Sequence, residues 1–364
     1  MSSPYQFLPA RAFWRSAVAE RMPLDPGQDI YQPRFRISRT DQIATAGSCF
    51  AQHVGRTLRQ AGYSVLDAEP VPEPLRSSLS AETMARYGYG IYSARYGNIY
   101  TVRQLLQLLR EVRGGDFSLA DPVWEKDGRF YDAFRPSVEP DGLESPEAVL
   151  EHRLHHLEAV RSLLRATDVM VFTLGLTEAW VEETTGTVYP TAPGTIAGQF
   201  DPKRHKFHNF GFKSVFSDFV AVRRIMMLKK PDMRFLITVS PVPLTATASG
   251  QHVEVATCYS KSVLRAVCGA LVEEFDNVDY FPSFEIITSQ SARGMYYEPN
   301  LRSVSPHGVE RAMSVFMNAH DVAATGSPQG EETETPPQKI QRKRGKTVSE
   351  SVVCEEALLE AFAR

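Results

Sequence analysis

Two continuous apolar runs, at residues 169–173 and 235–239, constrain the fold of this chain most strongly. Runs of this kind, without alternating polar positions, are typical of strands buried on both faces of a parallel sheet. Helical segments precede both runs: residues 146–166 form a long amphipathic pattern, and residues 213–229 also read as a helix. Strands that alternate with helices imply a parallel sheet covered on both faces by right-handed crossovers. The sequence therefore predicts an α/β fold, a three-layer α/β/α sandwich with a parallel sheet.

Further segments extend the alternation of strands and helices along the chain. Apolar residues recur every four positions from Cys49 onward, and Gly62 is placed to end that helix. The remaining expected elements are strands at 43–46, 63–66 and 278–281 and helices at 253–274 and 309–317. The first of these strands leads through a tight turn into the first helix.

Composition changes along the chain predict one α/β domain with extensions at both ends. We expect an extended arm over residues 1–34 and the domain itself over 35–322. Within the domain, the Gly-, Pro- and Thr-rich stretch 180–209 is too long for a simple connection, which indicates a lid, a substrate-binding loop or a small hairpin. Residues 323–348 are expected to be a disordered linker. Residues 349–364 can form a terminal helix that docks on its own domain or binds a protein partner.

The overall composition is that of a soluble, cytoplasmic protein. The chain has 364 residues, a formal net charge of −3 and 43% hydrophobic residues, so it can bury a core and is not a general nucleic-acid binder. The basic run at 339–346 lies outside the expected core. We expect no secretory signal and no membrane span. The four cysteines lack CxxC spacing, so neither a zinc site nor a disulfide is expected.

The pair Gly47-Ser48, between an expected strand and an expected helix, is the best local signal for chemistry. A serine there lies at the carboxyl edge of the sheet, where open α/β folds bind ligands. The following helix N-terminus offers backbone N–H groups to an oxyanion formed on attack at a carbonyl. The spacing alone equally fits a serine that only caps the helix.

The sequence blocks around this pair resemble one protein family. TAGSCFAQHVGRTL at residues 45–58 matches the block that gives the GSCFA family its name. Five more blocks resemble that family in its order, at residues 95–109, 173–180, 238–247, 258–267 and 280–288. The chain is thus identified as a member of the GSCFA family, which is similar to the SGNH hydrolases. That resemblance implies an SGNH-hydrolase-like, flavodoxin-like fold and ester hydrolysis or acyl transfer, often on carbohydrate.

SGNH hydrolases use a Ser, a Gly, an Asn and a His from successive blocks, and the first two can be placed here. The resemblance makes Ser48 the nucleophile and its own N–H one oxyanion donor. Gly97, followed by Asn98 in RYGNIYT, is the candidate glycine donor and binding position. Gly88 and Gly90 compete with it, and Gly97 equally fits a plain turn glycine.

The third block departs from the SGNH pattern. Where those hydrolases have Gly-x-Asn-Asp, this chain has Gly175-Leu176-Thr177-Glu178. Thr177 can donate one O–H in place of the Asn amide, although loss of an oxyanion donor costs on the order of 10²–10³ in rate. Glu178 can act as a general base, orient a histidine, bind a backbone amide or pair with an arginine.

The general base has two candidates. His307 stands just before a predicted helix, as the SGNH histidine does, but Val304 occupies the position of the usual acid and a strict alignment places Ser303 at the catalytic position. His208, at the end of the long 180–209 stretch, is the competitor. Each histidine equally fits a surface or loop role.

Two other residues near these blocks carry weaker hypotheses. Cys49 at the start of a helix can be a nucleophilic thiolate, or a small buried residue under the turn. Lys261 follows Ser260 too closely for the two to share a helix face, so it is expected to bind an anionic substrate rather than to form a Ser-Lys dyad.

The leading hypothesis is a serine ester hydrolase or acyltransferase that acts through an acyl-Ser48 intermediate, on a small-molecule or carbohydrate ester, without metal or organic cofactor. The alternative is a catalytically silent binding module for a glycan or an acylated ligand. A third reading, partner or nucleic-acid binding through the tail, depends only on the basic run at 339–346.

Overall fold

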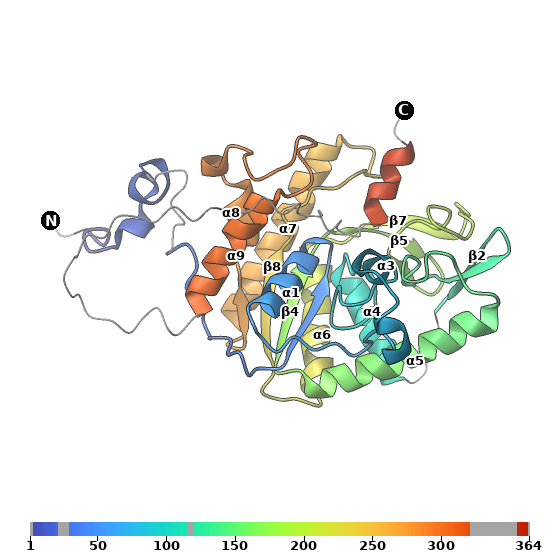
Figure 1. Cartoon of the computed structure of the whole chain (residues 1–364). Helices are drawn as coiled ribbons and strands as arrows, with labels where there is room; N and C mark the ends of the chain where they lie inside the picture. Colours follow the sequence, from blue (N-terminus) through green and yellow to red (C-terminus); the bar gives the residue numbers. More distant parts are fainter. Residues whose placement is uncertain (1–2, 21–28, 115–118, 321–354, 363–364) are drawn as a thin grey trace, which may run out of the picture.

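A four-stranded parallel sheet forms the centre of the molecule, with strand order β1-β4-β8-β9. The computed structural model describes residues 3–20, 29–114, 119–320 and 355–362 (Figure 1). The strands are β1 (Ile43–Gly47), β4 (Val169–Leu174), β8 (Arg234–Val239) and β9 (Val278–Tyr280). Gly47 pairs with Thr173, and Thr173 with Thr238, so the carboxyl ends of the three strands share one edge of the sheet.

Helices cover both faces of this sheet. One face carries α1 (Phe50–Gln60), α8 (Ser283–Thr288) and α9 (Pro306–His320), and the other carries α4 (Val102–Arg113), α5 (Pro146–Ala166), α6 (Phe212–Met227) and α7 (Val253–Glu274). Side chains of a strand alternate between the faces. Val169 and Val171 accordingly pack with the first group, and Met170 and Phe172 with the second. The predicted α/β/α sandwich with a parallel sheet is confirmed.

The helix that follows the Gly97 block begins where the sequence provides a cap. Thr101 accepts a hydrogen bond from the backbone N–H of Gln104, while the Gln104 side chain accepts one from the N–H of Thr101. This capping box fixes the direction in which the chain enters α4. The loop before it, which contains Asn98 and Tyr100, is thereby held at the carboxyl edge of the sheet.

The stretch expected as a lid, loop or hairpin folds as part of a second, antiparallel sheet of order β6-β5-β7. Its strands are β5 (Glu178–Glu182), β6 (Val188–Tyr189) and β7 (His205–Asn209). A hairpin of β2 (Val123–Lys126) and β3 (Arg129–Asp132) was not anticipated. The strand expected at 63–66 is reduced to one parallel bridge, between Val65 and Ile43. Two short helices, α2 (Glu73–Arg76) and α3 (Ala81–Arg86), precede the Gly97 block.

Both extensions of the domain are described in part. The N-terminal arm contains short helices at Ala10–Ala12 and Arg15–Ala19 and then places the buried Tyr31, whose hydroxyl donates to Asp279 Oδ2 at 3.0 Å. The linker expected at 323–348 lies outside the described residues. Of the terminal helix expected at 349–364, residues Glu355–Phe362 form a 3₁₀ helix, η5, and the others are not described.

Helix α7 has the length and apolar composition of a helix that can cross a membrane. In this fold it packs against β8 and β9, and its Leu264 and Val267 lie in the core. Its inner face also reaches the carboxyl edge of the sheet, where it places Ser260 and Lys261.

Candidate functional site

Ser48 lies where β1 turns directly into α1. Gly47 ends the strand with φ +138°, and a β-carbon there would lie 2.5 Å from the Thr173 carbonyl oxygen. Only glycine fits this position, because any side chain would meet the backbone of the neighbouring strand. The carbonyl of Ser48 already accepts the helical hydrogen bond of the Ala51 N–H at 2.8 Å. The serine is therefore fixed at the carboxyl edge of the sheet and at the start of a helix.

The hydroxyl of Ser48 is buried, and no described residue forms a hydrogen bond with it. The residue is 2% exposed. Gly175 lies against it so closely that a β-carbon on Gly175 would be 2.7 Å from Ser48 Cβ and 3.3 Å from Ser48 Oγ. A buried polar group without a partner costs on the order of 1–3 kcal/mol. The missing partner of such a group can be a water, a ligand or a reacting group.

The backbone N–H of Ser48, which was expected to be an oxyanion donor, forms a hydrogen bond within the sheet. It donates to the carbonyl oxygen of Thr173 at 3.1 Å, which extends the pairing of β1 with β4 by one residue. In this structure it is not available to an oxyanion. Any oxyanion donors have to come from the loops around the serine.

Asn98 is the amide side chain that the structure brings to this edge. Its Oδ1 accepts hydrogen bonds from Gln52 Nε2, at 3.2 Å, and from the hydroxyl of Tyr92, which lies 3.2 Å from the Ser48 carbonyl oxygen. These contacts fix the Asn98 side chain so that its Nδ2 donor points away from Gln52 and Tyr92. Gly97 before it has φ +66°, a conformation that favours glycine and lets the loop turn here.

Tyr100 lies near Ser48 through its contacts with Gly175. Its carbonyl oxygen accepts hydrogen bonds from the N–H groups of Gly175, at 3.0 Å, and Leu176, at 2.9 Å. Through Gly175 this loop is packed against Ser48. The phenolic hydroxyl of Tyr100 is buried and, like Asn98 Nδ2, is directed at a carboxylate of the C-terminal segment.

That carboxylate belongs to Glu355, the first residue of η5. Glu355 Oε2 accepts hydrogen bonds from Asn98 Nδ2 and from the Tyr100 hydroxyl, the latter at 2.8 Å, while Oε1 accepts one from Ser137 Oγ. The neighbouring Glu356 pairs with Arg302, with Nη2 to Oε2 at 3.1 Å. Two donors thus converge on one oxygen, an arrangement that also suits an oxyanion.

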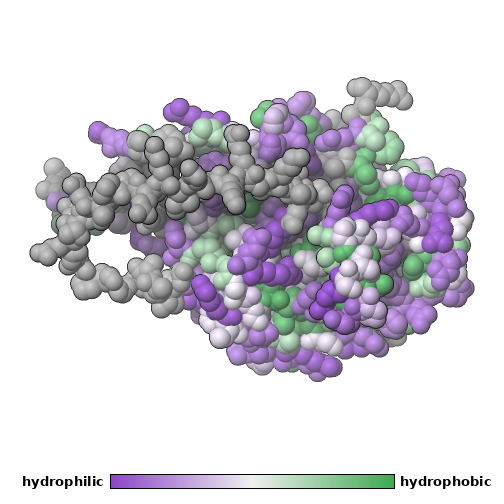
Figure 2. All heavy atoms as spheres, in the orientation of Figure 1, coloured by the Kyte–Doolittle hydropathy of each residue, from purple (hydrophilic) through white to green (hydrophobic). Residues whose placement is uncertain are grey.

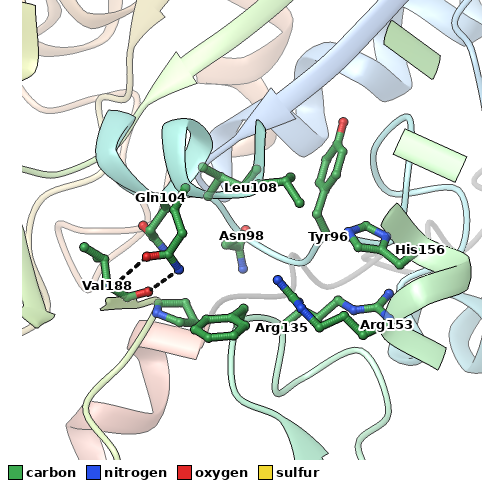
Figure 3. A pocket seen from close by; sticks show the side chains of 12 residues that line it. Tyr96, Asn98, Gln104, Leu108, Arg135, Arg153, His156 and Val188 are labelled. Atoms are coloured by element: carbon green, nitrogen blue, oxygen red, sulfur yellow. Dashed lines mark hydrogen bonds between the residues drawn. The ribbon is translucent and has the colours of Figure 1, made fainter. Parts of the chain in front are cut away.

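A small cavity lies beside Asn98. It has a volume of about 30 Å³ and is lined in part by Gln107, Arg135 and His156 (Figure 3). Gln107 closes one wall by two hydrogen bonds with the backbone of Val188, at 2.8 and 3.0 Å. The volume suffices for water and not for an ester substrate.

Lys261 of α7 is the buried cation beside this edge. It is 3% exposed, and its Nζ donates to the carbonyl oxygen of Gly175 at 2.7 Å. Burial is the main reason that the pKa of Lys261 is lowered to about 8. The charges of Glu356 and Cys49 raise this pKa, and the charge of Arg302 lowers it. A lysine of this kind is part neutral near physiological pH and can accept a proton.

Thr177 and Glu178 lie further along the chain from Gly175. The Thr177 hydroxyl is buried without a hydrogen-bond partner among the described residues, while its N–H donates to Ser260 Oγ at 3.1 Å. Glu178 Oε1 accepts a hydrogen bond from Thr247 at 2.9 Å. Burial raises the pKa of the Glu178 carboxyl. Among the described residues, no histidine or arginine forms an ion pair or a hydrogen bond with Glu178. The structure therefore gives no contact that would let Glu178 orient a histidine or pair with an arginine.

Both candidate histidines are exposed, and neither is bonded to Ser48. His307 lies at the start of α9 with its ring 5.5 Å from that of Tyr296. His208 lies on β7, opposite Ala179, with its ring 4.4 Å from that of Phe210. Burial and the charge of Arg103 lower the pKa of His208. Ser48 Oγ has no hydrogen-bond partner among the described residues, so in this conformation neither these histidines nor Lys261 is bonded to it.

The structure adds Tyr100, Ser137 and Glu355 to the residues that the sequence indicated, and it places Lys261 beside them. Tyr100 is in the same block as Gly97 and Asn98, which is a signal that the sequence contained. Lys261 was considered for anion binding, and its burial beside Gly175 requires the packing of α7. Glu355 lies beyond all the blocks that carry the family resemblance, so no pattern indicated it. Cys49 is buried, as the structural reading of that residue expected.

Comparison with known proteins identifies one family. The family model described as GSCFA family matches residues 42–316, about three quarters of the chain. A search of curated proteins finds no match. Within the part of the chain that the structure describes, no group of three or more His, Cys, Asp and Glu side chains is arranged to hold a metal ion.

Proposed function

Because this chain belongs to the GSCFA family, we propose that it is a serine ester hydrolase or acyltransferase of the SGNH-hydrolase type, with Ser48 as the nucleophile. One observation carries the proposal. A buried serine hydroxyl without a hydrogen-bond partner lies at the carboxyl edge of a parallel sheet, against a glycine that leaves no room for a side chain. Ligand sites of open α/β folds lie at this edge.

Asn98 and Tyr100 are the proposed oxyanion donors. In SGNH hydrolases an asparagine amide supplies this hydrogen bond, and Asn98 takes that role here in place of Thr177. Its Nδ2 and the Tyr100 hydroxyl already converge on one carboxylate oxygen of Glu355. Two such donors, fixed before the reaction, stabilise the negative charge that develops on the carbonyl oxygen of an ester.

We assign the general base to Lys261 rather than to His307 or His208. The lysine is buried beside Gly175, whereas both histidines are exposed. As Ser48 Oγ attacks the carbonyl carbon, its proton passes to neutral Lys261, directly or through one water. The ester C–O bond then breaks, the alcohol leaves with that proton, and water or an acceptor hydroxyl attacks acyl-Ser48 to release the acid or the new ester.

Labelling with a fluorophosphonate probe tests the nucleophile. We expect an adduct on Ser48, located by mass spectrometry and absent from Ser48→Ala, in the full chain or in its Glu355→Gln/Glu356→Gln variant. An adduct justifies assays with acyl esters and sugar acetates, the substrate class that the family resemblance implies. Absence of label in both chains, under conditions that label a serine esterase, refutes the proposal and favours a silent module that binds a glycan or an acylated ligand.

The base is tested by comparing three variants under the same labelling conditions. Lys261→Met should slow labelling by about 10²- to 10⁴-fold, the usual contribution of a positioned base. His307→Ala and His208→Ala should label at the rate of the parent. In the parent the labelling rate should rise as the pH passes through about 8, because the base has to be neutral. Burial, together with the charges of Glu356, Cys49 and Arg302, sets the pKa of Lys261 at about 8. A histidine variant that slows labelling while Lys261→Met does not would reassign the base.

A further inference from the structure

The C-terminal segment η5 is attached to the domain by its first two residues. Glu355 and Glu356 are 3% and 8% exposed, whereas Leu358 and Phe362 are 48% and 67% exposed. The segment projects from the domain near β5 and β7 (red in Figure 1), and apolar atoms are visible on its surface at the upper right of Figure 2. Hydrogen bonds and an ion pair of Glu355 and Glu356 tie this end of the segment to the domain.

The place that holds the Glu355 carboxylate is built by the domain itself. Its three donors, Asn98 Nδ2, the Tyr100 hydroxyl and Ser137 Oγ, come from two loops distant in sequence from the segment. Asn98 is fixed from behind by Gln52 and Tyr92. We call these three side chains the carboxylate seat. Because a buried carboxylate is tolerated only where hydrogen bonds replace its water, three preset donors specify a ligand oxygen rather than an apolar group.

Two basic side chains, Arg302 and Lys261, lie near the carboxylate seat. Arg302 pairs with Glu356 at 3.1 Å. Burial lowers the pKa of Lys261, the charge of the same glutamate raises it, and the lysine is mostly protonated at pH 7. The domain therefore presents neutral donors and positive charge together, at the edge of the sheet that carries Ser48. This combination favours an anionic ligand over a neutral one.

We infer that the carboxylate seat is a binding site for small carboxylic acids at the entrance to Ser48, and that Glu355 of the chain's own C-terminal segment fills it in the free protein. A carboxylic acid is also the product class of ester hydrolysis, so this step deepens the proposed function. While Glu355 is seated, Ser48 remains 2% exposed and closed to substrate. A short terminal segment that is anchored through Glu355 and Glu356 can be displaced, so a ligand carboxylate opens the site by competition.

Hydrogen exchange on the full chain tests the carboxylate seat, and the measurement does not require the protein to be an active enzyme. The backbone amides of 355–362 should be protected in the free protein. Glutarate should increase their exchange, and glutaramide, of the same shape without charge, should not. The Glu355→Gln chain should lose protection by about 10- to 100-fold, the value of a hydrogen-bonded charge. Glu360→Gln, an exposed glutamate of the same segment, serves as the matched control and should leave protection unchanged.

Two results would overturn the inference: unprotected 355–362 amides in the free chain, or equal effects of glutarate and glutaramide. Ser137→Ala, which changes the seat and leaves the segment intact, should weaken protection as well. These readouts do not require a reactive serine, and they can be repeated in Ser48→Ala. If exchange behaves as expected while no chain labels at Ser48, the proposed function fails and the carboxylate site stands. If Glu355→Gln accelerates labelling of Ser48, the segment also controls access to it.

Discussion

Two buried polar clusters lie on either side of Asn98, and they are built on opposite principles. On the inner side, Asp132 bonds Arg135 at 2.7 Å and Arg153 at 3.0 Å, and Arg153 also bonds Glu111, so each charge is paired within the domain. On the outer side, the Ser48 hydroxyl has no hydrogen-bond partner in the part of the chain that the structure describes, and Asn98 donates to Glu355 of the C-terminal segment. A cluster whose partners all lie within the domain serves the fold. A cluster completed by an orphan hydroxyl and a terminal segment is the one that the proposed function and the proposed carboxylate site use.

The largest effect is expected where the inner cluster is broken. Arg153→Met leaves Asp132 and Glu111 buried with fewer cations, which should lower the free energy of unfolding by about 3–5 kcal/mol, measured by denaturant titration. The matched control is Arg86→Met, because Arg86 forms an exposed ion pair with Asp141 and its loss should cost no more than about 1 kcal/mol. Equal losses from the two variants would contradict a structural role for the inner cluster.

Acid should weaken the same cluster through His156. Burial and the charge of Arg135 lower the pKa of His156 to about 4, although its hydrogen bond to Glu69 acts in the opposite direction and Arg153 adds to the lowering. The unfolded chain protonates this histidine near pH 6.5, so its contribution is complete above that pH and is lost as the pH falls toward 4.

His156→Gln should therefore reduce the fall in unfolding free energy between pH 7 and pH 5 by about 2 kcal/mol. His155→Gln is the control, since His155 is exposed on the same helix. The measurement is the free energy of unfolding at each pH, compared among the parent and the two variants. Identical slopes for all three chains would show that His156 does not contribute to acid sensitivity.

The fold was more accessible from the sequence than the site, for physical reasons. The runs 169–173 and 235–239 become β4 and β8 because continuous apolar segments have to be buried on both faces. The strand expected at 63–66 meets β1 only at Ile43, through one bridge with Val65 and the hydrogen bonds of Ser64 and Leu66. Local pattern specifies conformation well, and it does not specify how far a segment pairs.

The site depends on contacts between residues distant in sequence. The Gly47-Ser48 pair between strand and helix marked the position of Ser48, and the family resemblance gave it the role of nucleophile. Lys261 was judged only by its spacing from Ser260, whereas its position beside Gly175 results from how α7 packs on the sheet. Glu355 meets Asn98 across 257 positions of sequence, and no periodicity encodes such a contact.

The smallest effect on stability, and the sharpest contrast, is expected at Ser48 itself. Ser48→Ala removes a buried hydroxyl that has no partner, so the free energy of unfolding should stay unchanged or rise by up to about 1 kcal/mol. Ser283→Ala is the matched control: its hydroxyl is equally buried but bonds Thr238 at 2.6 Å and the Val239 carbonyl at 3.1 Å. That loss should cost about 1–3 kcal/mol, because a partner is left unsatisfied. If Ser48→Ala were as destabilising as Ser283→Ala, the Ser48 hydroxyl would have a structural partner, and the distinction between the two clusters would fail.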